Sequence, residues 1–112
     1  LLSLKRNYIV ANKNTTSSIC DALLVSQPGA ITFKINQSTL KGGLDVSDQE
    51  VKKTIKILAE TLKVIVEPGG AVAAAALLSK KIKVINKTVV VVLSGGNIDH
   101  DLFSQIVTNS YE

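Results

Sequence analysis

Two short glycine-containing sequences carry the side chains of this chain that are best suited to chemistry. They are Glu67-Pro68-Gly69-Gly70 and Ser94-Gly95-Gly96-Asn97. A carboxylate, a hydroxyl and an amide next to glycines can contact a small ligand, because glycine lets the backbone approach closely. By itself, the first sequence is also typical of a plain helix start, and the second of a tight turn from a strand into a helix. A chemical role therefore requires that the two sequences meet.

The surrounding pattern predicts that they meet at one edge of a parallel sheet. Residues 88–93 are β-branched up to a final leucine, which indicates a strand buried on both faces. A second short strand is expected at residues 64–66, and an apolar helix at 71–78 lies between the two strands. Ligands gather at the carboxyl ends of strands in open parallel sheets. The order of strand, helix, strand and helix thus predicts an α/β fold, a partial parallel sheet with flanking helices.

The remaining elements follow from local patterns. Ser47-Asp48-Gln49-Glu50 is a capping box, and an apolar stripe at helical spacing follows it through Leu62, so a helix begins there. Apolar Ile31, Phe33 and Ile35 alternate with polar residues, which predicts a half-buried extended segment. The other expected elements are a short helix within residues 1–10, a polar loop at 11–18, strand or irregular chain at 19–25, a strand at 44–46 and a last helix near 99–107.

The helix expected at residues 71–78 is apolar on every side. Such a helix is buried all round, or its second face is covered by something outside this chain. We therefore expect the chain to expose apolar surface, and to associate with itself or with a missing part.

Composition limits the partners and compartments that we expect. The chain has 112 residues, enough for one domain, and a net charge of +4. Aromatic residues are only 4% and do not interleave with the lysines, so we expect no nucleic-acid partner. The single cysteine, Cys20, permits no internal disulfide and fits the reducing cytoplasm. No apolar run approaches the roughly 20 residues of a membrane span. The absence of methionine leads us to expect a fragment.

Five segments together resemble the pyridoxal-phosphate-dependent serine/threonine dehydratases, which belong to the fold type II, tryptophan-synthase-β-like enzymes. The segments follow the family order and cover nearly the whole chain: residues 18–23, 28–33, 46–50, 66–71 and 92–99. The resemblance implies that residues 1–112 are the C-terminal part of the catalytic domain, a fragment of the large domain of that fold. It implies a parent enzyme, an ammonia-lyase that converts L-threonine or L-serine to a 2-oxo acid and ammonia.

The resemblance also implies the cofactor and the partners. The cofactor would be pyridoxal 5′-phosphate and the substrate an amino acid. The protein partners would be the missing N-terminal part of the enzyme and further copies in a homo-oligomer.

The resemblance assigns the second glycine-containing sequence to the cofactor ring. Ser94 matches the serine whose hydroxyl meets the pyridine nitrogen, and Gly95, Gly96 and Asn97 would shape the turn that presents it. A carboxylate in that place would hold the ring nitrogen protonated and make the ring a strong electron sink. A neutral hydroxyl does not, which suits elimination of a β-hydroxyl group, where the leaving group takes the electrons.

Two further positions are implied to line the cofactor site. Glu67 matches an active-site glutamate beside the ring; alternatively, its carboxylate satisfies free amides at a helix start. Ala22 lies where many relatives carry glycine, so its methyl group would narrow the site and affect substrate preference.

No residue of this chain is expected to be catalytic in the fragment. The family's Schiff-base lysine lies in a Ser-Phe-Lys-x-Arg-Gly sequence that is absent; Lys34 follows Thr-Phe but lacks the Arg-Gly, and we expect it to face solvent. The glycine-rich phosphate cradle and the upstream divalent-cation site are absent as well, so the fragment alone should be inactive. We expect His100 to be a surface residue at a helix start rather than a base for Ser94, and Cys20 to be a small core residue.

Two alternatives to a threonine or serine ammonia-lyase stay open. The parent could be a serine racemase or a hydroxy-amino-acid dehydratase of the same family, because residues outside the chain and around Ala22 decide between them. The chain could also be an autonomous α/β ligand-binding or interaction module with a glycine-rich turn. The absent methionine and the uncovered apolar helix argue against this module.

Overall fold

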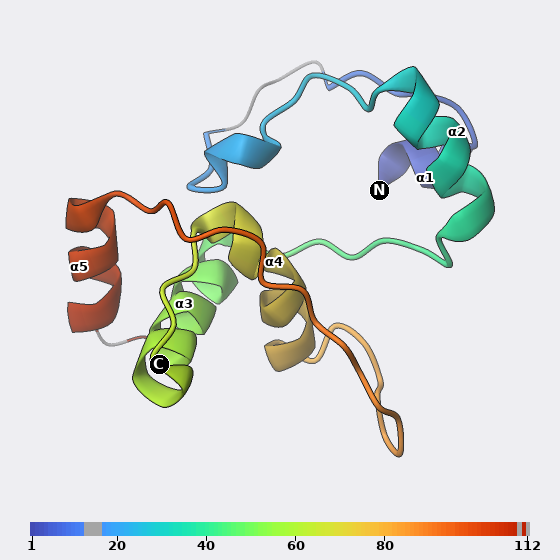
Figure 1. Cartoon of the computed structure of the whole chain (residues 1–112). Coiled ribbons are helices and arrows are strands. Elements are labelled where there is room, and N and C mark those ends of the chain that lie inside the picture. The colour runs from blue at the N-terminus through green and yellow to red at the C-terminus, as the bar shows by residue number, and fades with distance from the viewer. Residues whose placement is uncertain (13–16, 110, 112) are drawn as a thin grey trace.

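The computed structural model describes residues 1–12, 17–109 and 111. Within these residues the chain forms helices joined by irregular segments (Figure 1). The expected polar loop at 11–18 lies partly outside the described residues. In chain order, the elements are α1 (Leu2–Arg6), the 3-10 helix η1 (Asp21–Leu23), α2 (Ala30–Thr39), α3 (Asp48–Leu62), α4 (Pro68–Leu78) and α5 (His100–Thr108).

Helix α3 lies at the centre of the core, and its start is the capping box expected from the sequence. The Ser47 hydroxyl accepts a hydrogen bond from the Glu50 amide at 3.2 Å, and the Glu50 carboxylate accepts one from the Ser47 amide at 2.7 Å. These two bonds satisfy amides that a helix start otherwise leaves free. One apolar stripe of the helix is buried, at Val51, Ile55 and Leu58.

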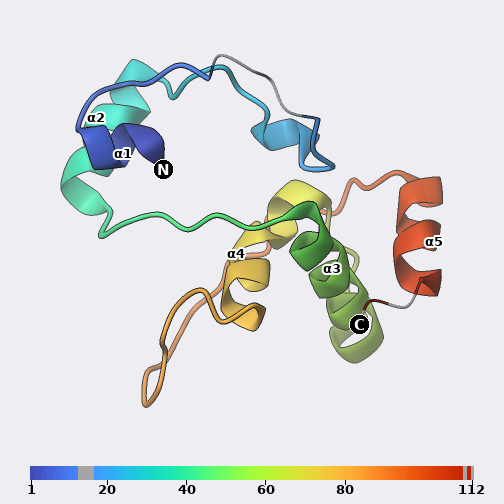
Figure 2. The ribbon, with the colours of Figure 1, turned by 180° about the vertical axis from the view of Figure 1, so that it is seen from behind.

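Helices α4 and α5 pack against opposite sides of α3 (Figures 1 and 2). The buried face of α4 consists of small residues, Ala71, Ala74 and Ala75, which let the two helix backbones approach closely. Helix α5 contributes Ile106, which is fully buried. The ammonium group of Lys56 on α3 donates hydrogen bonds to two carbonyl oxygens at the end of α5, so the packing of α5 also has a polar anchor.

The expectation of an extended segment around Ile31, Phe33 and Ile35 is wrong, because these residues lie in α2. Only Phe33 is buried there, while Ile31 and Ile35 are exposed. Residues four apart share one face of a helix, so alternation over five residues is compatible with a helix as well as with a strand. No neighbouring strand is present in the described residues to decide in favour of the strand.

The predicted strands at residues 44–46, 64–66 and 88–93 are irregular chain, and no residue in the described part is assigned to a strand. Strands are defined by ladders of backbone hydrogen bonds. No backbone bond between described residues joins segment 64–66 to segment 88–93; the nearest one lies just beyond both, from the Glu67 amide to the Gly95 carbonyl oxygen at 3.1 Å. The side chains of Val90 and Val92 are 87% and 69% exposed. The α/β fold is therefore not formed by the described residues.

The described chain is open rather than tightly packed. Helices α1 and α2 lie together, apart from the body formed by α3, α4 and α5 (Figure 2). The radius of gyration is 15.1 Å, whereas a compact domain of this length has about 13 Å. Helix α4 has one uncovered side, where Val72 and Ala73 line an apolar hollow of about 590 Å³. The expected exposure of apolar surface is thus confirmed; the expected association is a prediction.

Candidate functional site

The two glycine-containing sequences meet, although 30 residues separate Glu67 from Asn97. The Glu67 amide donates to the Gly95 carbonyl oxygen at 3.1 Å. In return, the Glu67 carboxylate accepts a hydrogen bond from the Asn97 amide at 3.2 Å. The structure therefore brings the start of α4 and the turn at residues 94–97 to one place, as the sequence pattern predicts, but without a sheet.

Glycines make this approach possible. A Cβ atom on Gly70 would lie 2.5 Å from the Ser94 carbonyl oxygen, and one on Gly96 would lie 2.7 Å from the Ile65 carbonyl oxygen. Gly95 has a φ angle of 99°, and a Cβ atom there would lie 2.7 Å from the Glu67 carboxylate. Backbone thus touches backbone at two points of the turn, and the turn itself requires a left-handed residue.

Ser94 is exposed at the edge of this contact. Its carbonyl group faces Gly70, whereas its hydroxyl makes no hydrogen bond to any described residue. A hydroxyl that the protein leaves free can donate to or accept from a ligand atom. The turn therefore presents one neutral polar group on rigidly packed backbone.

Glu67 occupies the N-cap position of α4 and is half-buried, but its side chain does not cap that helix. The carboxylate instead accepts from the Asn97 amide and faces Gly95. The alternative prediction, that it satisfies free amides at the helix start, is therefore wrong. The negative charge also lies at the N-terminal end of α4, where the helix dipole favours it.

Ala22 lies in η1, which packs against the start of α4. Its Cβ atom is 3.6 Å from the place that a Cβ atom on Gly69 would occupy. The Cγ atom of Leu23 is equally close to that place. Ala22 therefore lies next to the residue that precedes Gly70, at the side of the candidate site.

Three other residues for which the sequence predicts no catalytic role lie outside the candidate site. Lys34 is exposed, as expected, although on a helix. His100 is the exposed first residue of α5 and makes no hydrogen bond to Ser94. Cys20 is buried in the core, and burial raises the pKa of its thiol above the usual value, which suits a structural cysteine. Among the described residues, no group of acidic, histidine or cysteine side chains could hold a metal ion.

One carboxylate that organises this region is not predicted by the sequence pattern. Both oxygens of Asp48 accept hydrogen bonds from the segment before η1: Oδ1 from the Ser18 hydroxyl at 2.6 Å, and Oδ2 from the Ile19 amide at 3.1 Å. The pattern around Asp48 indicated only the capping box of a helix start. No local signal identifies a partner about 30 residues away.

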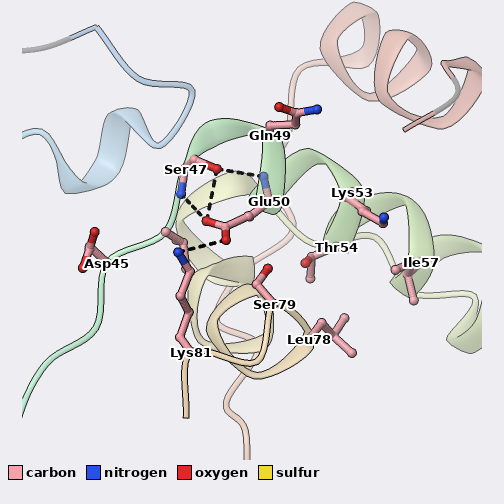
Figure 3. A pocket seen from close by; sticks show the side chains of 11 residues that line it. Asp45, Ser47, Gln49, Glu50, Lys53, Thr54, Ile57, Leu78, Ser79 and Lys81 are labelled. Carbon is pink, nitrogen blue, oxygen red and sulfur yellow. Dashed lines mark hydrogen bonds and ion pairs between the residues drawn. The ribbon is translucent and has the colours of Figure 1, made fainter. Parts of the chain in front are cut away.

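A polar pocket of about 550 Å³ lies at the opposite end of α4, between that end and the start of α3 (Figure 3). There the ammonium group of Lys81 lies 3.0 Å from the Glu50 carboxylate. Hydrogen bonds from the Ser47 amide and from Lys81 lower the pKa of Glu50 to about 2. Ser47, Glu50 and Lys81 therefore bond to one another in Figure 3, and the pocket is distinct from the site at the 94–97 turn.

The sequence pattern of a family described as "Pyridoxal-phosphate dependent enzyme" matches residues 3–95. Among individual relatives, the L-threo-3-hydroxyaspartate ammonia-lyase of Saccharomyces cerevisiae is 35% identical over 103 residues. The match covers 92% of this chain and 32% of that enzyme. In the described part of the chain, no helix combines the length and the apolar character needed to cross a membrane.

Two solved structures are similar in fold as well as in sequence. A threonine deaminase from T.th. superposes with a TM-score of 0.81 at 30% identity, over 88% of this chain and 35% of that one. The serine racemase of Dictyostelium discoideum has a TM-score of 0.76 at 32% identity, over 88% of this chain and 31% of that one. The chain thus adopts the arrangement of part of a fold type II enzyme, and it spans about a third of the length of these relatives.

Proposed function

The chain belongs to the family of pyridoxal-phosphate-dependent enzymes, and on that premise we propose that it is part of an ammonia-lyase. The proposed enzyme converts L-threonine or L-serine to a 2-oxo acid and ammonia. Residues 1–112 form the C-terminal portion of its catalytic domain. The names of the similar proteins, an ammonia-lyase and a threonine deaminase, support this reaction.

The observation that carries the proposal is the exposed hydroxyl of Ser94 on the 94–97 turn, which makes no hydrogen bond to a described residue. A flat heteroaromatic ring needs one polar group in its plane, and the exposed Ser94 hydroxyl can supply it. The donor set therefore fits the pyridine end of pyridoxal phosphate. When bound, pyridoxal phosphate supplies an electron sink for the substrate's α-carbon.

In this proposal the role of Ser94 is to hold the ring nitrogen by a neutral hydrogen bond. Because a hydroxyl carries no charge, it does not hold a proton on that nitrogen as a carboxylate would. Such a neutral contact would suit elimination of the substrate's β-hydroxyl group. Glu67 keeps the turn in place through the Asn97 amide and would lie beside the ring.

In this proposal the lysine that would hold the cofactor is not one of this chain's residues. In the described residues no lysine side chain pairs or hydrogen bonds with Glu67 or Ser94, and Lys34 lies on exposed α2. We therefore assign the lysine, and the groups that bind the cofactor phosphate, to the part of the enzyme that the chain does not span. The complete enzyme is proposed to be a homo-oligomer, and the chain alone is proposed to be inactive.

A pyridoxal-phosphate titration of the 112-residue chain tests whether the essential lysine lies outside it. Binding is followed by visible spectroscopy, and activity by release of 2-oxo acid from L-threonine. No specific absorption band and no product are expected. A saturable band with turnover would contradict the assignment of the lysine.

The role of Ser94 is tested in the complete enzyme by Ser94→Asp. Dehydration turnover should fall by about 10²-fold, the usual effect of spoiling one preorganised polar contact. Ser104→Asp, on an exposed position of α5, is the matched control and should leave turnover unchanged. Equal turnover in the two variants would remove Ser94 from the mechanism.

Serine racemisation is a second candidate, supported by the similarity to the Dictyostelium discoideum enzyme. It differs from dehydration in its product, so chiral chromatography of the reaction of L-serine separates the two. D-serine in excess over 2-oxo acid would favour the racemase.

A further inference from the structure

The segment that carries Ala22 is tied to the helical body by one carboxylate. Asp48, the first residue of α3, accepts from the Ser18 hydroxyl at 2.6 Å through one oxygen and from the Ile19 amide at 3.1 Å through the other. The Ser18 oxygen in turn accepts from the Cys20 amide at 3.1 Å. Three consecutive residues before η1 are thus fixed by a single side chain, directly or through Ser18.

No other hydrogen bond joins described residues 17–25 to α3, α4 or α5. The next bonds along this segment run to the N-terminal side instead, from Asn12 to carbonyl oxygens at positions 25 and 26. Packing adds the buried Cys20 side chain and the partly buried Ile19 side chain as further anchors, but packing alone is not directional. The orientation of the segment therefore depends on Asp48.

This segment positions the residues at one side of the candidate site. Immediately after Cys20 the chain forms η1, which lies over the N-terminal end of α4 in both ribbon views (Figures 1 and 2). Ala22 and Leu23 are there in ordinary contact distance of the space next to Gly69. The following residue, Gly70, touches the Ser94 carbonyl group.

We propose that Asp48 is a positioning residue that holds η1, and with it Ala22, against the start of α4 beside the 94–97 turn. Asp48 acts through Ser18 and Ile19 and touches none of the candidate site residues itself. The inference rests on the proposed function only in treating Ala22 as a residue that lines the binding site. Asp48 on α3 would then determine how closely Ala22 approaches the site.

Disulfide trapping tests this placement directly. In a chain with Cys20→Ala, the pair Ala22→Cys and Gly69→Cys places two Cβ atoms at the 3.6 Å separation of the structure. Disulfides need Cβ atoms about 3.5–4.5 Å apart, so this pair should oxidise readily and completely. Adding Asp48→Asn should slow the initial oxidation about tenfold, because the Ser18 hydroxyl and the Ile19 amide then lose their charged acceptor.

Asp101→Asn is the matched control, since Asp101 also lies in the first turn of a helix but bonds to no loop. It removes the same charge and should leave the oxidation rate unchanged. Ser18→Ala should slow oxidation as Asp48→Asn does, and the double variant should be no slower than the slower single variant. Ser18→Ala also keeps the proposal testable if Asp48→Asn does not fold.

Equal oxidation rates for Asp48→Asn and Asp101→Asn would overturn the proposal. So would a variant in which urea unfolding shows lost stability while the cross-link still forms at the original rate, because Asp48 would then stabilise α3 without positioning η1. Neither readout involves pyridoxal phosphate or turnover. The proposed function can therefore fail while the positioning role stands, and the reverse is equally possible.

Discussion

The contact between α4 and the 94–97 turn makes a sharp prediction for two adjacent glycines. Gly69 and Gly70 lie in the first turn of the same helix. A methyl group at Gly69 would meet its nearest neighbours at 3.6 Å, whereas one at Gly70 would meet the Ser94 carbonyl oxygen at 2.5 Å. Replacing each by alanine therefore adds the same methyl group where there is space for it, at Gly69, and where there is none, at Gly70.

The size of the difference follows from those distances. Glycine to alanine gains about 1 kcal/mol of helix propensity at either position, so this gain cancels in the comparison. In Gly70→Ala the turn must also retreat by about 0.9 Å to reach ordinary contact, and such overpacking costs about 1–3 kcal/mol. Gly69→Ala should stabilise the chain slightly, and Gly70→Ala should be about 1–3 kcal/mol less stable than Gly69→Ala.

Urea unfolding followed by circular dichroism measures the free energy of unfolding of both variants. Amide hydrogen exchange at Asn97 adds a local readout, because its amide is bonded to Glu67 across the contact. Exchange there should accelerate in Gly70→Ala and stay slow in Gly69→Ala. Equal stability of the two variants, with equal protection at Asn97, would refute the close approach of α4 and the turn.

Three further variants test other parts of the structure. Gly95→Ala forces a φ angle of 99° on a residue with a Cβ atom and should cost about 1–3 kcal/mol in thermal unfolding. Because the pKa of Glu50 is lowered to about 2, its stabilisation is complete above the ordinary pKa of 4.5 and is lost as the pH falls from there toward 2; Glu50→Gln should therefore flatten the pH dependence of the urea midpoint in that window. Lys56→Met removes donors 2.8 and 2.7 Å from the Val107 and Asn109 carbonyl oxygens and should destabilise the chain by about 1 kcal/mol, with faster amide exchange in α5.

Elements with a local cause were predictable from the sequence. The capping box at Ser47 and Glu50 and the apolar stripe behind it predicted α3, and Pro68 after Glu67 predicted the start of α4. The alternation at 31–35 misled because five residues fit both periods. Strands depend on partners rather than on their own residues, so the valines at 89–92 could indicate burial on both faces without revealing that the described residues supply no ladder.

The candidate site was predictable in one respect and not in another. Two glycine-rich sequences at the ends of successive apolar segments predicted that residues 67–70 and 94–97 would meet. Two hydrogen bonds join residues about 30 apart: the Asn97 amide donates to Glu67, and the Ser18 hydroxyl donates to Asp48. Nothing in the neighbouring sequence distinguishes these two acids from other carboxylates at helix starts. The roles of Ser94 and Ala22 toward a cofactor remain predictions.

The geometry of the turn does not depend on the sheet that the sequence pattern indicates. The turn is held by two hydrogen bonds to Glu67 and by the contact of the Ser94 carbonyl group with Gly70. Ser94 and the side chains of Val90 and Val92 are exposed. A partner that completes the site can therefore reach both the free Ser94 hydroxyl and these exposed apolar side chains while the contact of α4 with the turn is kept.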